Sequence, residues 1–217
     1  MRPKRSSVPV RKGEFPAKQV FLVRHAEAVG TREGQFVGRS DPPLSSRGRR
    51  HAERIARKMA RVPAERVISS PKRRALETAR CIASIQKVSV EIRPELAELD
   101  FGEWEGRSWR NLAPRERRLY QRWLADPWRT VPPEGESLRS LWSRVGRFWR
   151  DLRSSRTEGA AIVVAHAGSL RVLLCHALQL PPRAVTRFVI NLGAISSLKL
   201  TSNHGWLVTL NHETVGF

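Results

Sequence analysis

Two histidines and an arginine stand directly after apolar runs of the chain. Arg24 and His25 follow "KQVFLV" (18–23), and His166 follows "AIVVA". Histidine acts as a nucleophile when one ring nitrogen is held by an acceptor and the other faces an electrophile. Arginine donates paired hydrogen bonds to tetrahedral phosphoryl oxygens and stays charged. These residue types therefore predict chemistry at a phosphoryl group.

A lone histidine after a strand is usually an ordinary hydrogen-bonded loop residue, so the repetition of the pattern matters. Both histidines end apolar runs, and each is followed by Ala and then by Glu or Gly. A third apolar run, "RVISS" (66–70), leads to Arg73 and Arg74. Since the carboxyl ends of parallel strands share one edge of a sheet, we expect these side chains to converge on a phosphate pocket.

The remaining elements must place these runs side by side. "KQVFLV" (18–23), "RVISS" (66–70) and "GAAIVVAH" (159–166) are short apolar runs typical of buried strands, and "KVSVEI" (87–92) alternates like a strand. Helical spacing marks 45–62, where Ser45 or Ser46 is a plausible cap, the segment after Pro71, which we place in the first turn, and "SLRVLLCHAL". The last two apolar runs, "FVINLGAISSLKL" and "GWLVTLNH", predict a hairpin. This order predicts an α/β fold, a three-layer α/β/α sandwich with a mainly parallel sheet.

Residues 103–150 form an irregular helical excursion between two strands. Six of the seven tryptophans lie there: Trp104, Trp109, Trp123, Trp128, Trp142 and Trp149. Aromatic residues at helical spacing usually belong to a core, so we expect a helical cap packed onto the sheet. The alternative is that some of these rings form an apolar wall for a leaving group that contains a ring.

The charge balance is strongly basic. The chain has 217 residues, with 40 Lys and Arg against 20 Asp and Glu, and a formal net charge of +20. Such an excess attracts anions: nucleic acid, acidic membrane surfaces or phosphorylated small molecules. Because the charges are spread along the chain, a solvated arginine-rich surface is the simpler interpretation.

Domain organisation and location follow from the same sequence. Residues 1–17 are rich in proline and charge, which predicts a basic, disordered tail or, alternatively, an organelle transit peptide. Residues 18–217 are expected to form one domain. No run approaches the ~20 apolar residues of a membrane span. Cys81 and Cys175 lack metal-ligand spacing and are expected to be reduced core residues of a cytoplasmic protein.

Four ordered motifs resemble the histidine phosphatase superfamily, which has the phosphoglycerate-mutase-like fold. The opening pattern stands as "RHAEAVGTREGQFVGRSDPPLSSRG" from Arg24 to Gly48. "SSPKRRALETA" is similar to the second-arginine motif and places that arginine at Arg74, while "VVAHAGSLR" is similar to the second-histidine motif at His166. "ELAELDFGEWEG" is similar to the segment that supplies the acid, with Glu98 in its position. The resemblance covers about residues 18–212.

The resemblance implies a role for each matched residue. His25 would attack phosphorus and become transiently phosphorylated, while Arg24, Arg74 and His166 would hold the phosphoryl oxygens. Glu98 would protonate the leaving alkoxide and then take a proton from water. The acid segment has five acidic residues, and the motif register selects Glu98 over Asp100 or Glu103. For Arg74, the alternative is a surface charge on a helix. The resemblance assigns substrate binding to Arg24, Thr31, Val37, Gly38, Arg74 and His166.

Several positions depart from the family pattern. Ala26 and Ala167 replace glycines beside the two histidines, Ala28 replaces Thr or Ser, and Thr31 stands where Asn often binds phosphate. Replacing glycine with alanine adds a methyl group and excludes positive φ, which costs little here. These changes leave the nucleophile, His25, in place. The loss of Asn bears on substrate choice.

Within the family, the compact length with "DFGEWEG" and "EGESL" resembles the alpha-ribazole phosphatase and small broad-specificity branch. We therefore expect a phosphoric monoester hydrolase acting on a small phosphorylated metabolite, with alpha-ribazole 5'-phosphate as one candidate. A phosphoglycerate-mutase-type phosphotransferase is the alternative within the family. A nucleic-acid-binding protein that retained the fold is the alternative from another class, and so is a ligand-binding pseudoenzyme.

The expected partners and cofactors are few. We expect a small phosphorylated substrate, no specific nucleic acid and no membrane, and at most a second copy of the chain in a homodimer. The predicted pocket takes its positive charge from arginine and histidine, and no carboxylate cluster at ligand spacing accompanies it. No metal and no cofactor are therefore predicted.

Overall fold

The structure is a computed structural model that describes residues 18–31, 34–155, 159–201 and 204–212. A six-stranded sheet in the order β3-β2-β4-β1-β5-β6 forms its centre. The strands are β1 (Lys18–Arg24), β2 (Ala64–Ser69), β3 (Val90–Ile92), β4 (Ala160–Ala165), β5 (Ile195–Leu200) and β6 (Gly205–His212). The predicted tail, residues 1–17, lies outside the described residues.

The sheet is parallel over four neighbouring strands and ends in an antiparallel hairpin. β3, β2, β4 and β1 run in the same direction, whereas β5 is antiparallel to β1 and β6 is antiparallel to β5. The register pairs both Val23 of β1 and Ser69 of β2 with Val164 of β4. The carboxyl ends of these three strands therefore lie level, which confirms the predicted mainly parallel sheet and brings their loops to one edge.

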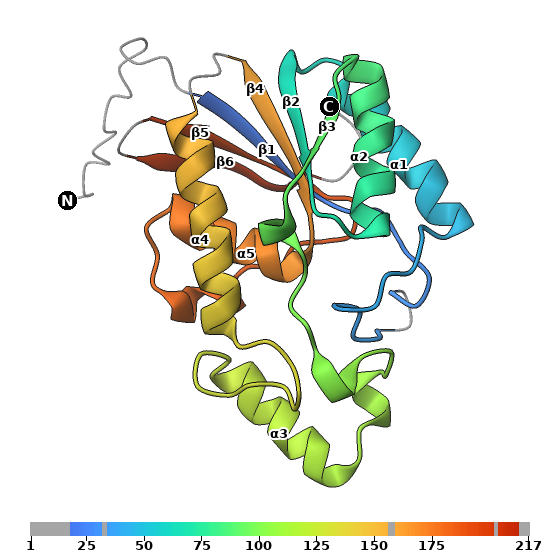
Figure 1. The fold of residues 1–217 in the computed structure, drawn as a ribbon, viewed down its shortest axis with the longest axis vertical. Coiled ribbons are helices and arrows are strands. Elements are labelled where there is room, and N and C mark those ends of the chain that lie inside the picture. The colour runs from blue at the N-terminus through green and yellow to red at the C-terminus, as the bar shows by residue number, and fades with distance from the viewer. Residues whose placement is uncertain (1–17, 32–33, 156–158, 202–203, 213–217) are drawn as a thin grey trace, which may run out of the picture.

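Helices cover both faces of the sheet (Figure 1). α1 (Ser46–Met59) and α2 (Arg73–Gln86) pack on one face, and α4 (Leu138–Ser154) and α5 (Ala167–Ala177) on the other. β4 is buried throughout because its alternate residues face opposite layers. Ala161 and Val163 join the α4 and α5 core, whereas Ile162 and Val164 join the α1 and α2 core.

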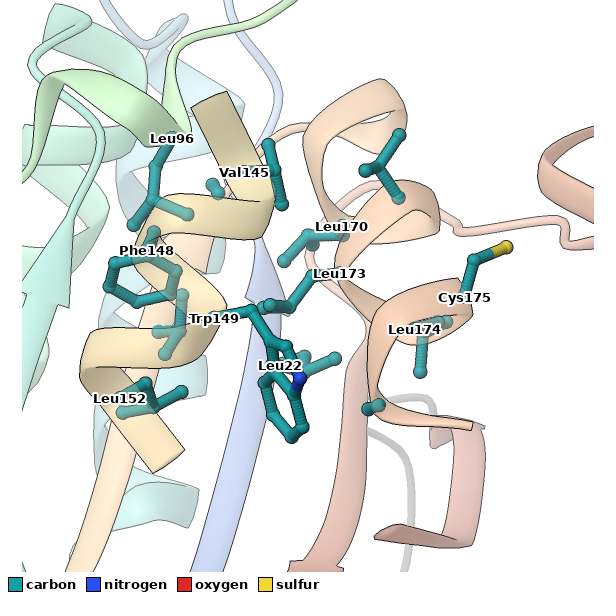
Figure 2. Packing of buried hydrophobic residues seen from close by; sticks show 14 of the residues in the cluster. Leu22, Leu96, Val145, Phe148, Trp149, Leu152, Leu170, Leu173, Leu174 and Cys175 are labelled. Atoms are coloured by element: carbon teal, nitrogen blue, oxygen red, sulfur yellow. The ribbon is translucent and has the colours of Figure 1, made fainter. Parts of the chain in front are cut away.

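The α4 and α5 layer forms the larger core. Figure 2 shows Trp149 of α4 lying between that helix and α5, close to Leu22 of the sheet. Phe148 and Leu152 continue the same apolar face of α4, because residues three and four apart lie on one side of a helix. This packing fixes α5, and α5 begins directly after His166.

The excursion over 103–150 divides into two structural parts. α4 is an outer layer of the sandwich, whereas α3 (Pro114–Ala125) lies beyond the ends of the strands (Figure 1). Three short 3-10 segments precede α3 and a fourth follows α5: η1 (Pro94–Leu96), η2 (Gly102–Trp104), η3 (Trp109–Asn111) and η4 (Pro182–Arg187). Trp104 is fully buried in a small core beneath α3 with Phe36 and Leu112. The outlying part therefore has its own core, while Trp149 packs with the sheet.

Several element boundaries differ from the sequence expectations, including those of α2, β3 and α1. α2 begins at Arg73 after Lys72 as N-cap, so Pro71 precedes the helix and is not in its first turn. Lys87 adopts a left-handed conformation with φ 56° that ends α2, and β3 therefore starts only at Val90. α1 ends at Met59 with Ala60 as its C-cap, earlier than the predicted residue 62.

The described part of the chain contains no helix that is long and apolar enough to cross a membrane. Cys81 and Cys175 are both free thiols, as the sequence predicted. Cys175 is buried in the α4 and α5 core, whereas Cys81 is half-buried beside the other core.

Candidate active site

The three parallel strands deliver their first loop residues to one point. The His25 amide donates to the Ala165 carbonyl at 3.0 Å, and the Ser70 amide donates to the Val164 carbonyl at 3.0 Å. The chain leaves β4 directly into His166. The imidazole rings of His25 and His166 lie 5.0 Å apart, inclined by 59°. The predicted convergence of the two histidines is therefore present.

His25 is held in the tautomer that a nucleophile requires. Its Nδ1 lies 2.7 Å from the Ala26 carbonyl oxygen, which can only accept, so we place the proton on Nδ1. Nε2 then carries the lone pair, and it accepts a hydrogen bond from Arg74 Nε at 3.3 Å. Burial, reinforced by Arg24 and Arg74, holds the pKa of His25 well below its usual range. The ring is therefore neutral at physiological pH, with Nε2 available for attack.

His166 is fully buried and has one ring nitrogen to spare. Its Nε2 lies 2.7 Å from Ser70 Oγ, and this hydroxyl accepts from the Lys72 amide at 3.3 Å. The hydroxyl proton of Ser70 can therefore be donated to Nε2, which leaves the imidazole proton on Nδ1. Nδ1 has no hydrogen-bond partner among the described residues. It is the atom that can donate to a phosphoryl oxygen.

Two buried guanidinium groups flank His25. Arg24 donates from Nη1 to the Ile190 carbonyl at 2.6 Å, while its buried Nε has no partner in the described part of the chain. Burial lowers the pKa of Arg24 to about 10, so the group stays charged at neutral pH. Arg74 is fully buried and bonds the carbonyls of Ser40 and Val37 at 3.0 and 2.9 Å. The alternative of a surface helix charge is therefore wrong for Arg74.

The loop that holds Arg74 is itself held by Glu105, which the sequence analysis did not single out. The Glu105 carboxylate accepts from the amides of Gly38 and Arg39 at 2.9 and 2.6 Å, and from Ser40 Oγ at 2.7 Å. Gly38 has no room for a Cβ because it lies against the Leu99 carbonyl. The predicted substrate-binding residues Val37 and Gly38 therefore border the site, with these backbone groups engaged by protein partners.

Replacing Glu105 with alanine should loosen this loop. We expect the free energy of unfolding to fall by about 1–2 kcal/mol, because several amide donors lose a charged acceptor. We also expect KM to rise more than kcat falls, since Arg74 would lose the fixed carbonyls of the loop. Urea unfolding and steady-state kinetics measure both changes. Glu103→Ala, an exposed neighbour, is the control and should change neither.

Glu98 is placed by the N-terminus of α5. Its carboxylate accepts from the Gly168 amide at 3.1 Å and from the Leu99 amide at 3.0 Å. A Cβ on Gly168 would overlap Glu98 Oε1, so only glycine allows this approach. Asp100 instead caps Gly102 and faces Arg39 at 3.7 Å. Of these two carboxylates, only Glu98 bonds the helix that starts beside His166.

The remaining predicted positions behave differently from one another. Thr31 uses its hydroxyl within its own turn, where it donates to the Ala28 carbonyl at 2.7 Å and accepts from the Ala28 amide at 3.0 Å. No hydrogen bond among the described residues ties it to the histidines or to Arg24 and Arg74. Ala26 and Ala167, which replace family glycines, both have negative φ. The missing glycines therefore cause no strain.

A cavity of about 330 Å³ is lined on one side by Glu98. Gly168 and Ala167 of α5 form one wall, and Phe101, Trp123 and Leu141 belong to the apolar remainder. Arg171 of α5 also lines it. The sequence analysis missed Arg171, although it lies in the quoted motif "VVAHAGSLR" three residues after Gly168, on the same helix face.

The combined charges suit an anionic ligand. Arg24, Arg74 and Arg171 are cationic, both histidines are neutral, and Glu98 supplies one carboxylate. Over the described ranges, no group of three His, Cys, Asp or Glu side chains could hold a metal ion. The geometry provides a nucleophile, donors for phosphoryl oxygens and a carboxyl group at the mouth of an apolar cavity.

The two buried histidines should make stability depend on pH. The pKa values of His25 and His166 lie well below the ordinary 6.5 because burial disfavours their charged forms. Only the unfolded chain takes up these protons near pH 6.5, so stability is complete above that pH and is lost as pH falls below it. We expect a loss of about 1.4 kcal/mol per pH unit for each histidine until the folded-state pKa is reached. Urea unfolding at pH 7.5, 6.0 and 5.0 should show a shallower slope for His166→Gln, and parallel slopes would contradict this cause.

Sequence comparison finds a matching family profile and similar proteins over most of the chain. The profile of the histidine phosphatase superfamily (branch 1) matches residues 20–213. The chain is 30% identical over 198 residues to an adenosylcobalamin/alpha-ribazole phosphatase of Escherichia coli K12, covering 91% of this chain and 98% of that protein. It is 31% identical over 157 residues to phosphoserine phosphatase 1 of Hydrogenobacter thermophilus, covering 72% and 74% of the two chains.

Solved structures share the fold. An alpha-ribazole phosphatase from Shigella flexneri superposes with a TM-score of 0.83 at 29% identity, covering 92% of this chain and 98% of that one. A mycobacterial glucosyl-3-phosphoglycerate phosphatase superposes with a TM-score of 0.82 at 23% identity, covering 91% and 100%. At the latter identity the likeness concerns the fold alone.

Proposed function

Because the chain belongs to the histidine phosphatase superfamily, we propose that this phosphatase hydrolyses small phosphomonoesters through a phosphohistidine at His25. The observation that carries the proposal is the fixed tautomer of His25. Its Nδ1 bonds the Ala26 carbonyl, so the Nε2 lone pair is presented beside Arg74 and His166. A neutral imidazole so oriented is an activated nucleophile.

In the first step, His25 Nε2 forms a bond to phosphorus as the ester oxygen leaves with the P–O bonding pair. Arg24, Arg74 and His166 Nδ1 would donate hydrogen bonds to the non-bridging oxygens and stabilise their charge in the transition state. The unpartnered buried atoms Arg24 Nε and His166 Nδ1 support these roles. Since the guanidinium of Arg74 is anchored by two carbonyls, it needs little reorganisation during the reaction.

In its protonated form, Glu98 would donate a proton to the departing alkoxide, which becomes an alcohol and leaves Glu98 as the carboxylate. Water then attacks the phosphohistidine, Glu98 takes the proton from that water, and the P–N bond breaks to release inorganic phosphate and free imidazole. The position of the Glu98 carboxylate between the N-terminus of α5 and the cavity supports both proton transfers.

We further propose alpha-ribazole 5'-phosphate as one candidate substrate. Two proteins named as alpha-ribazole phosphatases are 30% and 29% identical to this chain. The apolar cavity beside Glu98 offers aromatic walls, Phe101 and Trp123, for a leaving group that contains a ring. This supports the wall alternative for Trp123, whereas Trp104 belongs to the core beneath α3. The free cysteines are consistent with action in the cytoplasm, which we also propose.

A panel of phosphorylated metabolites tests the function. We expect the protein to release inorganic phosphate from several small phosphomonoesters, including alpha-ribazole 5'-phosphate, without added metal. The assay also contains a second phosphate acceptor, 3-phosphoglycerate, to detect transfer. No release from any ester would contradict hydrolysis, and transfer exceeding release would favour the phosphotransferase alternative. Binding to DNA with a steep salt dependence, together with no hydrolysis, would favour the nucleic-acid-binding alternative.

A further inference from the structure

The cavity beside Glu98 lies where a leaving group must go, given the proposed function. Glu98 and the first residues of α5 belong both to this cavity and to the site around His25 and His166. A group protonated by Glu98 therefore departs into the cavity. Its volume of about 330 Å³ lies at the lower end of small-molecule pockets, which suits a single small alcohol.

The wall of the cavity is mainly apolar. Phe101 and Trp123 meet edge to face, with ring centroids 6.0 Å apart. Leu138 and Leu141 of α4 and Val185 of η4 close the remaining sides. Such a wall favours an aromatic or aliphatic ring in the leaving group.

Arg171 is an exception in this wall, because it is a cation that makes no hydrogen bond with the described residues. Its Nε is buried and unpaired, and the hydrogen bonds and ion pairs of the described residues include none from its guanidinium. Trp123 Nε1, in the same wall, is also buried without a partner. Unpaired buried donors are costly unless a ligand accepts from them. Both donors are therefore suited to an acceptor on the bound molecule.

The position of Arg171 on α5 sets its relation to the reacting group. Arg171 follows Gly168, the donor to Glu98, by three residues, which is about one helical turn. Long helical side chains lean toward the N-terminus, so Arg171 leans back toward the Glu98 end of the cavity. Burial lowers the pKa of Arg171, and the nearby carboxylate of Glu98 opposes this shift in part. An alcohol that leaves past Glu98 consequently meets Arg171.

We propose that Arg171 determines specificity for the leaving group by donating to an acceptor on it, a carboxylate being the best match. The preferred substrate class is then the phosphate ester of an alcohol that combines an apolar ring with such an acceptor. The ring contacts Phe101 and Trp123, and the acceptor pairs with the guanidinium.

A matched pair of substrates tests this role. Benzyl phosphate and its 4-carboxy derivative have the same ring and similar leaving alcohols, and they differ in the acceptor. We expect the wild-type protein to prefer the carboxylated ester by about 10- to 100-fold in kcat/KM, as for a charge-assisted hydrogen bond. Arg171→Met should abolish this preference by lowering kcat/KM for the carboxylated ester at least about tenfold more than for benzyl phosphate. Arg183→Met, an exposed arginine of η4 outside the cavity wall, is the matched control.

Other results would overturn the proposal. If Arg171→Met lowers kcat/KM equally for both esters, Arg171 acts on Glu98 and not on the leaving group. If the wild-type protein hydrolyses both esters with the same kcat/KM, it recognises no acceptor on the leaving group. If the wild-type protein hydrolyses neither ester, that result contradicts the proposed phosphatase function but not the role of Arg171. Calorimetric binding of benzylphosphonate and 4-carboxybenzylphosphonate then decides the role of Arg171, since equal affinities would contradict it.

Discussion

Replacing His25 with alanine is expected to lower kcat by about 10⁴-fold or more, for every phosphomonoester that the protein hydrolyses. In the proposed mechanism Nε2 of His25 forms the bond to phosphorus, and His166 cannot replace it because its Nε2 is engaged by Ser70 Oγ. Release of inorganic phosphate from benzyl phosphate measures the loss. Rapid quenching of ³²P-labelled substrate should find an acid-labile phosphoenzyme in the wild-type protein and none in the variant.

The control for this prediction is another histidine of the same chain. His204 is exposed directly before β6, so His204→Ala should retain activity and phosphoenzyme formation. Because His25 is buried, the folding of His25→Ala must be verified by circular dichroism and urea unfolding. Comparable turnover by a folded His25→Ala protein would eliminate the phosphohistidine mechanism.

Replacing Glu98 with glutamine is expected to produce the second-largest effect, and one that depends on the leaving group. Glutamine cannot donate an acidic proton, so hydrolysis of benzyl phosphate should slow by about 10²- to 10⁴-fold. 4-Nitrophenyl phosphate releases a stable phenolate and needs little protonation. Its phosphorylation step should therefore slow by less than about tenfold, which a burst of nitrophenolate would reveal.

Asp100→Asn is the matched control for Glu98→Gln, because both remove one carboxylate from the same acidic segment. Asp100 caps Gly102 and faces Arg39, so its loss should alter kcat by less than about threefold. A large, leaving-group-dependent loss of activity in Asp100→Asn, with none in Glu98→Gln, would show that Asp100 and not Glu98 is the general acid. Equal losses for both esters in Glu98→Gln would mean that Glu98 only orients the site.

The anchoring of Arg74 bears on how it would stabilise charge. Arg74 is held by the Val37 and Ser40 carbonyls, and that loop is held by Glu105, so the guanidinium is oriented before substrate arrives. Preorganised donors in a buried site stabilise developing charge more than mobile donors in water. The cost of burying them is offset in part by Glu98, whose charge raises the pKa of both Arg24 and Arg74 against the lowering caused by burial.

Some features could be predicted because they depend on local order. The apolar runs before Arg24 and His166 predict strands, and parallel strands bring their ends together, so the pairing of His25 with His166 follows. The helical character expected for residues 103–150, which include α4, is equally local. It does not reveal which layer the helix joins. Packing against β1 and α5 placed α4 in the sandwich and left α3 outside it.

Other features depend on partners far away in the sequence. The motif register favours Glu98 over Asp100, but the contact that separates them physically joins Glu98 to Gly168, 70 residues later. Glu105 bonds Gly38 across 67 residues, and Ser70 bonds His166 across 96. The local periodicity of a sequence does not predict hydrogen bonds between such distant residues.

The sequence by itself determined the mainly parallel sheet, because strand order suffices for it. Its motif resemblance to the family selected the two histidines and the two arginines, because motif register depends only on residue type and spacing. Only the tertiary structure decided the tautomer of His25, the burial of Arg74 and the presence of Arg171 in the cavity wall. These properties arise from carbonyls, amides and apolar side chains that different segments bring to the same place, and their energies exist only once the chain is folded.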